Sequence, residues 1–215
     1  MFAENAFEDA LNELDNPILE NYELFVQFSD VKIYRKIEES SGLYEYKVIG
    51  IINCDTETCQ KVYMDLEYRK HWDTYVKELQ EICCNDFSVI YWNVNFPFPL
   101  ANRDYTFIRE CKRVDIGEKQ TWIILAQSYE TESIPPKPKI VRVENYRQFL
   151  IIQEHESKTR VFMHYFDNPG GSIPTWLINW AAKVFLKTGK GVPSFLSDME
   201  KACHGYKQYL SNKDK

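Results

Sequence analysis

The sequence predicts an α+β fold in which one curved, nine-stranded antiparallel sheet grips a long C-terminal helix. Nine segments have the composition and the bounding turns of β-strands, whereas four have the periodicity of helices. Short polar turns join most successive strands, as antiparallel pairing allows. The last helix, predicted over Pro174–Leu210, is the only element long enough to fill the concave face of such a sheet.

The first third of the chain mixes helical and strand patterns. Residues 7–14 place apolar side chains at helical spacing, and this pattern stops near Asn16–Pro17. Strands are predicted at Tyr22–Phe28, Val31–Ile37 and Leu43–Asn53. Asp55 or Thr56 then caps one helix, and a second short helix is predicted over Glu67–Tyr75.

The middle of the chain contains only strand patterns. The six predicted strands are Val76–Cys83, Phe87–Asn95, Arg103–Val114, Gln120–Tyr129, Ile140–Gln153 and Thr159–Phe166. Several of them are apolar on both faces, as in the run Trp122–Leu125. One helix cannot cover so much apolar surface, which favours an internal cavity. A tightly packed core remains compatible with the same pattern.

The C-terminal helix has a continuous apolar stripe. Its members are Trp176, Leu177, Trp180, Ala181, Val184, Phe195, Leu196, Met199, Ala202, Cys203, Tyr206 and Leu210. Gly170–Gly171 let the chain turn sharply into this helix, and Pro174 is tolerated in its first turn. Two interpretations follow: a core helix that closes an ordinary sheet, or a lid over a ligand cavity.

Size and charge restrict the possible functions. The 215 residues are expected to form a single domain over residues 1–215, and 44% hydrophobic and 27% charged residues are typical of globular proteins. The net charge of −6 argues against nucleic-acid binding, which depends on phosphate neutralisation. The sequence has no apolar run of about 20 residues and no signal-peptide pattern at its start.

Cysteine and histidine usage points to a cytoplasmic protein without a metal or cofactor. The six cysteines show no CxxC pairing, so free thiols in a reducing compartment are expected. The four histidines are scattered without the spacing of metal ligands.

Four long segments resemble the START lipid-transfer family. They are GLYEYKVIG (Gly42–Gly50), YMDLEYRKHWDTYVKEL (Tyr63–Leu79), VIYWNVNFPFPLANRDY (Val89–Tyr105) and VFMHYFDNPGGSIPTWLINWAAK (Val161–Lys183). The resemblance extends over nearly the whole chain and implies a helix-grip fold, with the C-terminal helix closing one lipid-sized tunnel. The chain departs from the family at Val184–Lys190, an insertion within the predicted lid helix.

The resemblance also implies a binding site for one phosphatidylcholine. The phosphate positions correspond to Tyr63, Arg69 and Gln148, with Asp73 pairing with the arginine, and the choline positions correspond to Trp92, Tyr105 and Tyr146. Arginine binds phosphate through charge-assisted hydrogen bonds, and aromatic faces attract a quaternary ammonium. The alternatives are an exposed Arg69–Asp73 pair on a helix surface and ordinary core aromatics.

The resulting hypothesis is a non-enzymatic, monomeric carrier that moves phosphatidylcholine between membranes. The alternative is a lipid-sensing module that signals to a regulatory protein partner when loaded. Catalysis is disfavoured because the sequence lacks GxSxG, HExxH and phosphate-loop motifs, although His164 lies near Asp167. Transient membrane contact is expected through the C-terminal helix, where Lys187 and Lys190 accompany Phe185 and Leu186.

Overall fold

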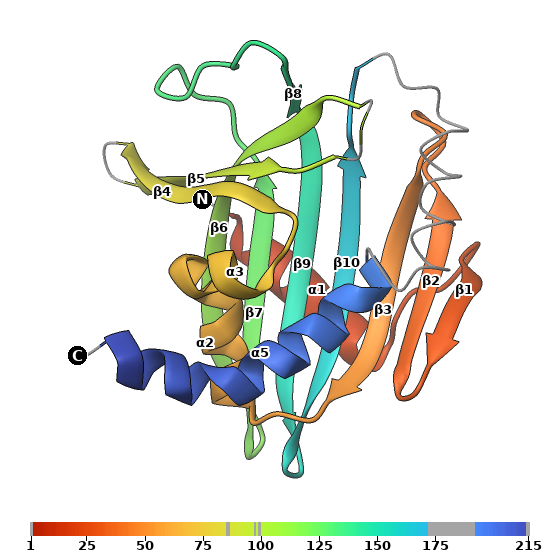
Figure 1. The fold of residues 1–215 in the computed structure, drawn as a ribbon. Coiled ribbons are helices and arrows are strands. Elements are labelled where there is room, and N and C mark those ends of the chain that lie inside the picture. The colour runs from red at the N-terminus through yellow and green to blue at the C-terminus, as the bar shows by residue number, and fades with distance from the viewer. Residues whose placement is uncertain (1, 85–86, 97, 99, 172–191, 214–215) are drawn as a thin grey trace.

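The computed structural model describes residues 2–84, 87–96, 98, 100–171 and 192–213, and these form one broad curved sheet with helices on both faces (Figure 1). The helices are α1 (Glu4–Asp15), α2 (Thr56–Met64), α3 (Leu66–Trp72) and α5 (Val192–Lys213). The strands are β1 (Glu23–Phe28), β2 (Val31–Ile37), β3 (Tyr44–Ile52), β4 (Val76–Cys84), β5 (Phe87–Val94), β6 (Asn102–Ile116), β7 (Lys119–Ser128), β8 (Ile140–Val143), β9 (Asn145–His155) and β10 (Lys158–Asn168).

The sheet confirms the predicted antiparallel architecture. Nine strands follow the order β1-β2-β3-β10-β9-β7-β6-β5-β4, and every neighbouring pair along this path is antiparallel. The prediction of one strand over Ile140–Gln153 was wrong, because the chain changes partners at the exposed Glu144. Before that residue β8 pairs in parallel with β6, and after it β9 pairs with β7 and β10.

Helices on both faces explain why so many strands are apolar on both sides. Helix α1 lies behind the sheet in Figure 1, whereas α2, α3 and α5 lie in front. Phe7 and Leu14 of α1 pack against Ile123 and Leu125, while Ile124 between them joins the cluster on the opposite face. Part of the apolar surface that favoured a cavity is therefore covered by the N-terminal helix.

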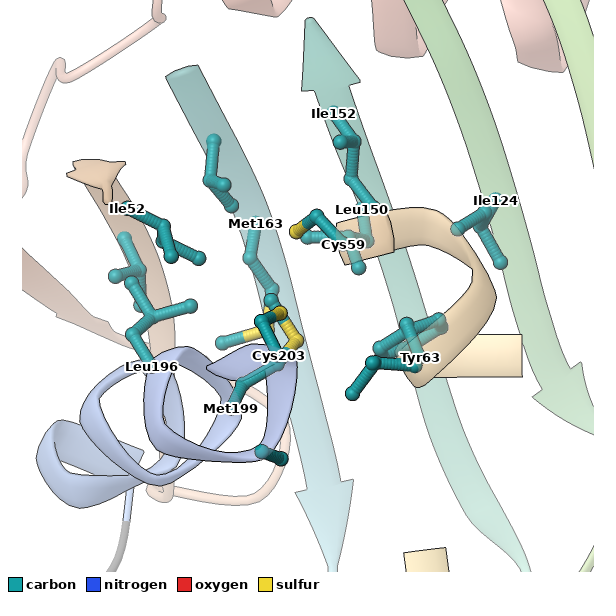
Figure 2. Close-up of a cluster of buried hydrophobic side chains, with 14 of the residues drawn as sticks. Ile52, Cys59, Tyr63, Ile124, Leu150, Ile152, Met163, Leu196, Met199 and Cys203 are labelled. Atoms are coloured by element: carbon teal, nitrogen blue, oxygen red, sulfur yellow. The ribbon is translucent and has the colours of Figure 1, made fainter. Parts of the chain in front are cut away.

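Helix α5 lies across the front face and buries one stripe of its surface (Figure 2). Leu196, Met199 and Cys203 are buried against strands of the sheet and against α2. Leu210 was wrongly assigned to this stripe, since it is 39% exposed. Tyr209 instead packs on Tyr68 of α3, with ring centroids 4.5 Å apart.

The C-terminal part of α5 is tied to α3 by two hydrogen bonds. The Tyr68 hydroxyl donates to the Ala202 carbonyl at 2.8 Å, and the Tyr206 hydroxyl donates to Asp65 Oδ2 at 3.0 Å. Gly205 permits this close approach, because a Cβ atom there would lie 2.9 Å from the Tyr68 hydroxyl oxygen. These contacts hold the second half of the helix against α3.

Several predictions fall on residues 172–191, which lie outside the described residues. They concern the start of the lid helix, with Pro174, Trp176 and Trp180, and the whole Val184–Lys190 insertion with Lys187 and Lys190. The described turn before this segment agrees with its prediction, because Gly170 and Gly171 have φ values of 58° and 75°.

The described residues also bear on two expectations about compartment and membranes. All six cysteines fall within the described ranges and are free, as predicted. None of the helices that the structure describes is long and apolar enough to cross a bilayer.

Candidate functional site

A pocket of about 260 Å³ opens between α3, the sheet and the first turns of α5. Five of the seven predicted site residues line it: Arg69, Asp73, Trp92, Tyr105 and Gln148. The other two, Tyr63 and Tyr146, are buried and contact lining residues. The volume is close to the lower end of small-molecule sites, about 300 Å³, so it suits a headgroup better than an entire lipid.

Strand register places the sheet residues of the site on one face. Trp92 of β5 faces Tyr105 of β6, and Gln148 of β9 faces Tyr165 of β10. Directly opposed residues on neighbouring strands point to the same side, and so do residues two apart on one strand. Four strands therefore present these side chains to the pocket together.

Arg69 and Asp73 form a largely buried ion pair at the C-terminal end of α3. Arg69 Nε donates to Asp73 Oδ2 at 2.9 Å, and the two side chains are only 12% and 7% exposed. The backbone N–H of Tyr75 donates to Asp73 Oδ1 at 3.1 Å, which fixes the carboxylate. The alternative of an exposed surface pair is thus wrong, and Arg69 is oriented by a carboxylate while it lines the pocket.

The aromatic residues contact one another as a continuous row. The ring centroids of Trp92 and Tyr105 are 5.0 Å apart, those of Tyr105 and Tyr146 are 5.5 Å apart, and those of Tyr146 and Tyr165 are 5.9 Å apart. The Arg69 guanidinium lies 4.7 Å from the Trp92 ring centroid. Burial raises the pKa values of Tyr105 and Tyr146, so both hydroxyls stay neutral. All four rings belong to one core cluster, and those of Trp92, Tyr105 and Tyr165 also line the pocket.

Tyr146 also positions Gln148. Its hydroxyl donates to Gln148 Oε1 at 2.6 Å, which leaves the amide nitrogen of Gln148 directed to Met163 Sδ at 3.1 Å. Tyr63 of α2 is buried beside Gln148, and its burial raises the pKa of its hydroxyl.

Sequence reasoning missed two charged residues near the pocket. Arg109 is enclosed behind Tyr63, and its guanidinium donates to the Tyr63 and Met64 carbonyls at 3.2 and 2.9 Å. Asp167 lines the pocket and accepts a 2.5 Å hydrogen bond from the Tyr105 hydroxyl. The strand alternation contained both signals, because Arg109 follows Tyr105 and Phe107 on one face and Asp167 follows Met163 and Tyr165.

His164 and Asp167 do not form an acid–base pair. His164 points to the opposite face of β10, where its Nε2 atom lies 3.2 Å from Glu45 Oε2. Within the described ranges, no three His, Cys, Asp or Glu side chains gather closely enough to hold a metal ion.

Comparisons with known proteins agree with this fold. The START domain profile matches residues 6–208. Mouse phosphatidylcholine transfer protein is 47% identical over 209 residues, which covers 95% of both chains. The human phosphatidylcholine transfer protein is 44% identical over 209 residues with the same coverage. The crystal structure of human STARD10 superposes with a TM-score of 0.81 over 99% of this chain and 84% of that chain, and at 23% identity this likeness concerns the fold alone.

Proposed function

The chain belongs to the START domain family, and we propose that it carries one phosphatidylcholine molecule between membranes without changing it chemically. The observation that carries this proposal is the pocket in which a buried, carboxylate-oriented arginine adjoins a row of aromatic rings. The names of the mouse and human relatives support the same lipid.

The phosphate group binds at the α3 end of the pocket. Arg69 supplies a guanidinium that can hold two phosphate oxygens, and Asp73 keeps it in place. The hydroxyl of Tyr63 and the amide of Gln148 lie on the same side as further hydrogen-bond donors. Arg109 adds a second buried positive charge behind Tyr63.

The choline group binds among Trp92, Tyr105 and Tyr146. A quaternary ammonium has no N–H to donate, so aromatic faces attract it at about 0.5–2 kcal/mol each. Because the three rings touch one another, choline enters by replacing some of these ring contacts. A primary ammonium in the same place brings three N–H donors, and Asp167, which already accepts from Tyr105, cannot accept from all of them; each buried donor left unpaired costs about 1–3 kcal/mol.

The acyl chains lie between α5 and the sheet, beyond the pocket. Two acyl chains contain roughly thirty methylenes, and their exposure to water costs about 24 kcal/mol at ~0.8 kcal/mol each. In Figure 2 the side chains of Leu196 and Met199 occupy this space beside Met163. Lipid entry therefore requires α5 to separate from the sheet there, while its C-terminal half stays tied to Tyr68 and Asp65.

The cytoplasm is the compartment in which this carrier works. Six free thiols, of which Cys83 is exposed, are typical of proteins kept in a reducing compartment.

The test is a transfer assay between donor and acceptor vesicles with labelled phosphatidylcholine or phosphatidylethanolamine. Wild-type protein is expected to transfer phosphatidylcholine faster, and Arg69→Met should abolish this transfer. Lys70→Met is the matched control, because Lys70 lies one position further on α3 and pairs with Glu67 at the surface. Equal transfer of the two lipids, or wild-type rates for Arg69→Met, would contradict the proposal.

A further inference from the structure

Strand β10 places the carboxylate of Asp167 beside the aromatic row. In β10 it stands opposite Tyr146 of β9, and it lies two residues after Tyr165, so its side chain shares their face. The Tyr105 hydroxyl donates to Asp167 Oδ2 at 2.5 Å. Asp167 thus contacts a member of the aromatic row while it also lines the pocket.

Asp167 has no ion-pair partner among the residues that the structure describes. The nearby Arg103 is fully buried, but its guanidinium donates to the backbone carbonyls of Ala101, Pro169 and Gly170. Arg103 therefore fastens the turn after β10 and only moderates the charge of Asp167 from a distance. An ionised carboxylate without a close cation is costly in such a place.

Asp167 is partly buried, and it lines the pocket. This burial raises the pKa of Asp167, although hydrogen bonds from Tyr105 and Tyr165 oppose the shift. The other groups that face it are Tyr146 and Tyr46, whose pKa values are raised by burial, and these phenols stay neutral. A cation in the pocket would give the Asp167 carboxylate the ion-pair partner that the described residues do not provide.

We propose that Asp167 is the anionic partner of the lipid's ammonium group and makes the site select headgroups that carry a positive charge. This inference rests on the proposed function and extends its headgroup site by one residue. The methyl groups of choline can lie against the aromatic faces. The Asp167 carboxylate, which is bonded to the Tyr105 hydroxyl, then stabilises the positive charge of the ammonium.

The two ends of the pocket then match a zwitterion. Arg69 lies over the Trp92 ring, Trp92 contacts Tyr105, and Tyr105 donates to Asp167. These contacts lead from the positive charge of Arg69 to the negative charge of Asp167. The headgroup of phosphatidylcholine has the complementary order, with a negative phosphate followed by a positive ammonium. Phosphatidylglycerol has the same phosphate but a neutral glycerol in place of the cation, so it forms no ion pair with Asp167.

Protonation of Asp167 provides a readout that a purely structural role lacks. Because the pKa of Asp167 is raised, this carboxyl group takes up a proton at a higher pH than an ordinary aspartate. The preference for phosphatidylcholine over phosphatidylglycerol should therefore weaken as the pH falls, and binding of phosphatidylcholine should release protons.

The experiment incubates the full chain with vesicles of equal phosphatidylcholine and phosphatidylglycerol content and measures the bound lipids by native mass spectrometry. Asp167→Asn, which keeps shape and the Tyr105 hydrogen bond, should lower the bound ratio of phosphatidylcholine to phosphatidylglycerol about tenfold and remove its pH dependence. Asp115→Asn is the control, since Asp115 is an exposed residue paired with Arg113. It should match the wild type.

Three results separate the possible failures. An unchanged lipid ratio in Asp167→Asn, or an equal loss of both lipids, would overturn the role of Asp167 and leave the carrier function standing. If Asp167→Asn fails to fold, the wild type alone provides the test. A ratio of phosphatidylcholine to phosphatidylglycerol that stays constant with pH would also overturn the role of Asp167. Wild-type protein that binds no phosphatidylcholine would instead refute the proposed function.

Discussion

Removal of Asp73 should destabilise the protein as well as its binding site. Asp73→Ala deletes the partner of Arg69 and the acceptor for the Tyr75 backbone N–H. The remaining arginine would be a cation with only 12% of its side chain exposed. Among the described residues, the cation–π contact with the Trp92 ring would then be its remaining favourable interaction at close range.

The magnitude follows from the burial of the pair. An exposed ion pair four residues apart on a helix contributes about 0.3–0.5 kcal/mol, whereas breaking a buried pair costs about 3–5 kcal/mol. The lost hydrogen bond to Tyr75 is a charge-assisted one, worth about 1.5–3 kcal/mol, and overlaps with that figure. At roughly 2–4 °C per kcal/mol for a chain of this size, the melting temperature should fall by about 6–20 °C.

Urea unfolding of three variants measures this cost. Asp73→Ala should lose about 3–5 kcal/mol, and the double variant Arg69→Met/Asp73→Ala should recover part of it, because no unpaired charge remains buried. Glu67→Ala is the control, since its surface pair with Lys70 should cost less than about 0.5 kcal/mol. A loss below about 1 kcal/mol in Asp73→Ala, with no recovery in the double variant, would show that water in the pocket screens the pair.

Three further predictions concern other parts of the fold. A hydrogen bond from His164 lowers the pKa of Glu45 in the folded protein. Ionised Glu45 therefore stabilises the fold above its unfolded pKa of about 4.3, and this stabilisation is lost as the pH falls further. Glu45→Gln should make the melting temperature less dependent on pH in the acid range. Gly205→Ala should destabilise the protein by about 1–3 kcal/mol in urea unfolding through its clash with Tyr68, and a destabilisation that Tyr68→Phe does not reduce would contradict this cause. Met199→Ala should cost about 2–5 kcal/mol by the same measurement, because the Met199 side chain is fully buried between α5 and the sheet; a cost below about 1 kcal/mol would mean that the helix packs loosely.

Local pattern predicted most of the fold because strand alternation and helix caps depend on nearby residues. Val31–Ile37 was predicted to the residue, and Asp55 caps α2 by accepting from the Thr58 backbone N–H. The break at Glu144 was missed because its cause is the choice of partner strands. Tyr209 was missed for a similar reason: the last turns of α5 pack on α3, which changes the face that is covered.

The site was less predictable from pattern than the fold. The spacing of Arg69 and Asp73 is compatible with a surface pair, and only tertiary structure buries it. Alternation placed Arg109 and Asp167 on inward faces, but a charged residue on such a face could equally mark the end of a strand. Pairing across β9 and β10 is what brings Asp167 to the aromatic row.

The position of the apolar cluster explains why headgroup selection can control the proposed carrier. The space assigned to the acyl chains is filled by Leu196, Met199 and Met163, which stabilise the chain through their mutual contacts. Acyl chains that enter there replace one set of apolar contacts with another of similar kind, so much of their burial energy offsets the opening of α5. Asp167 has no such internal substitute, since the described part of the chain offers it no ion-pair partner. Differences between lipids should therefore arise mainly at the headgroup, where Arg69 lies over Trp92 and Asp167 accepts from the adjoining Tyr105.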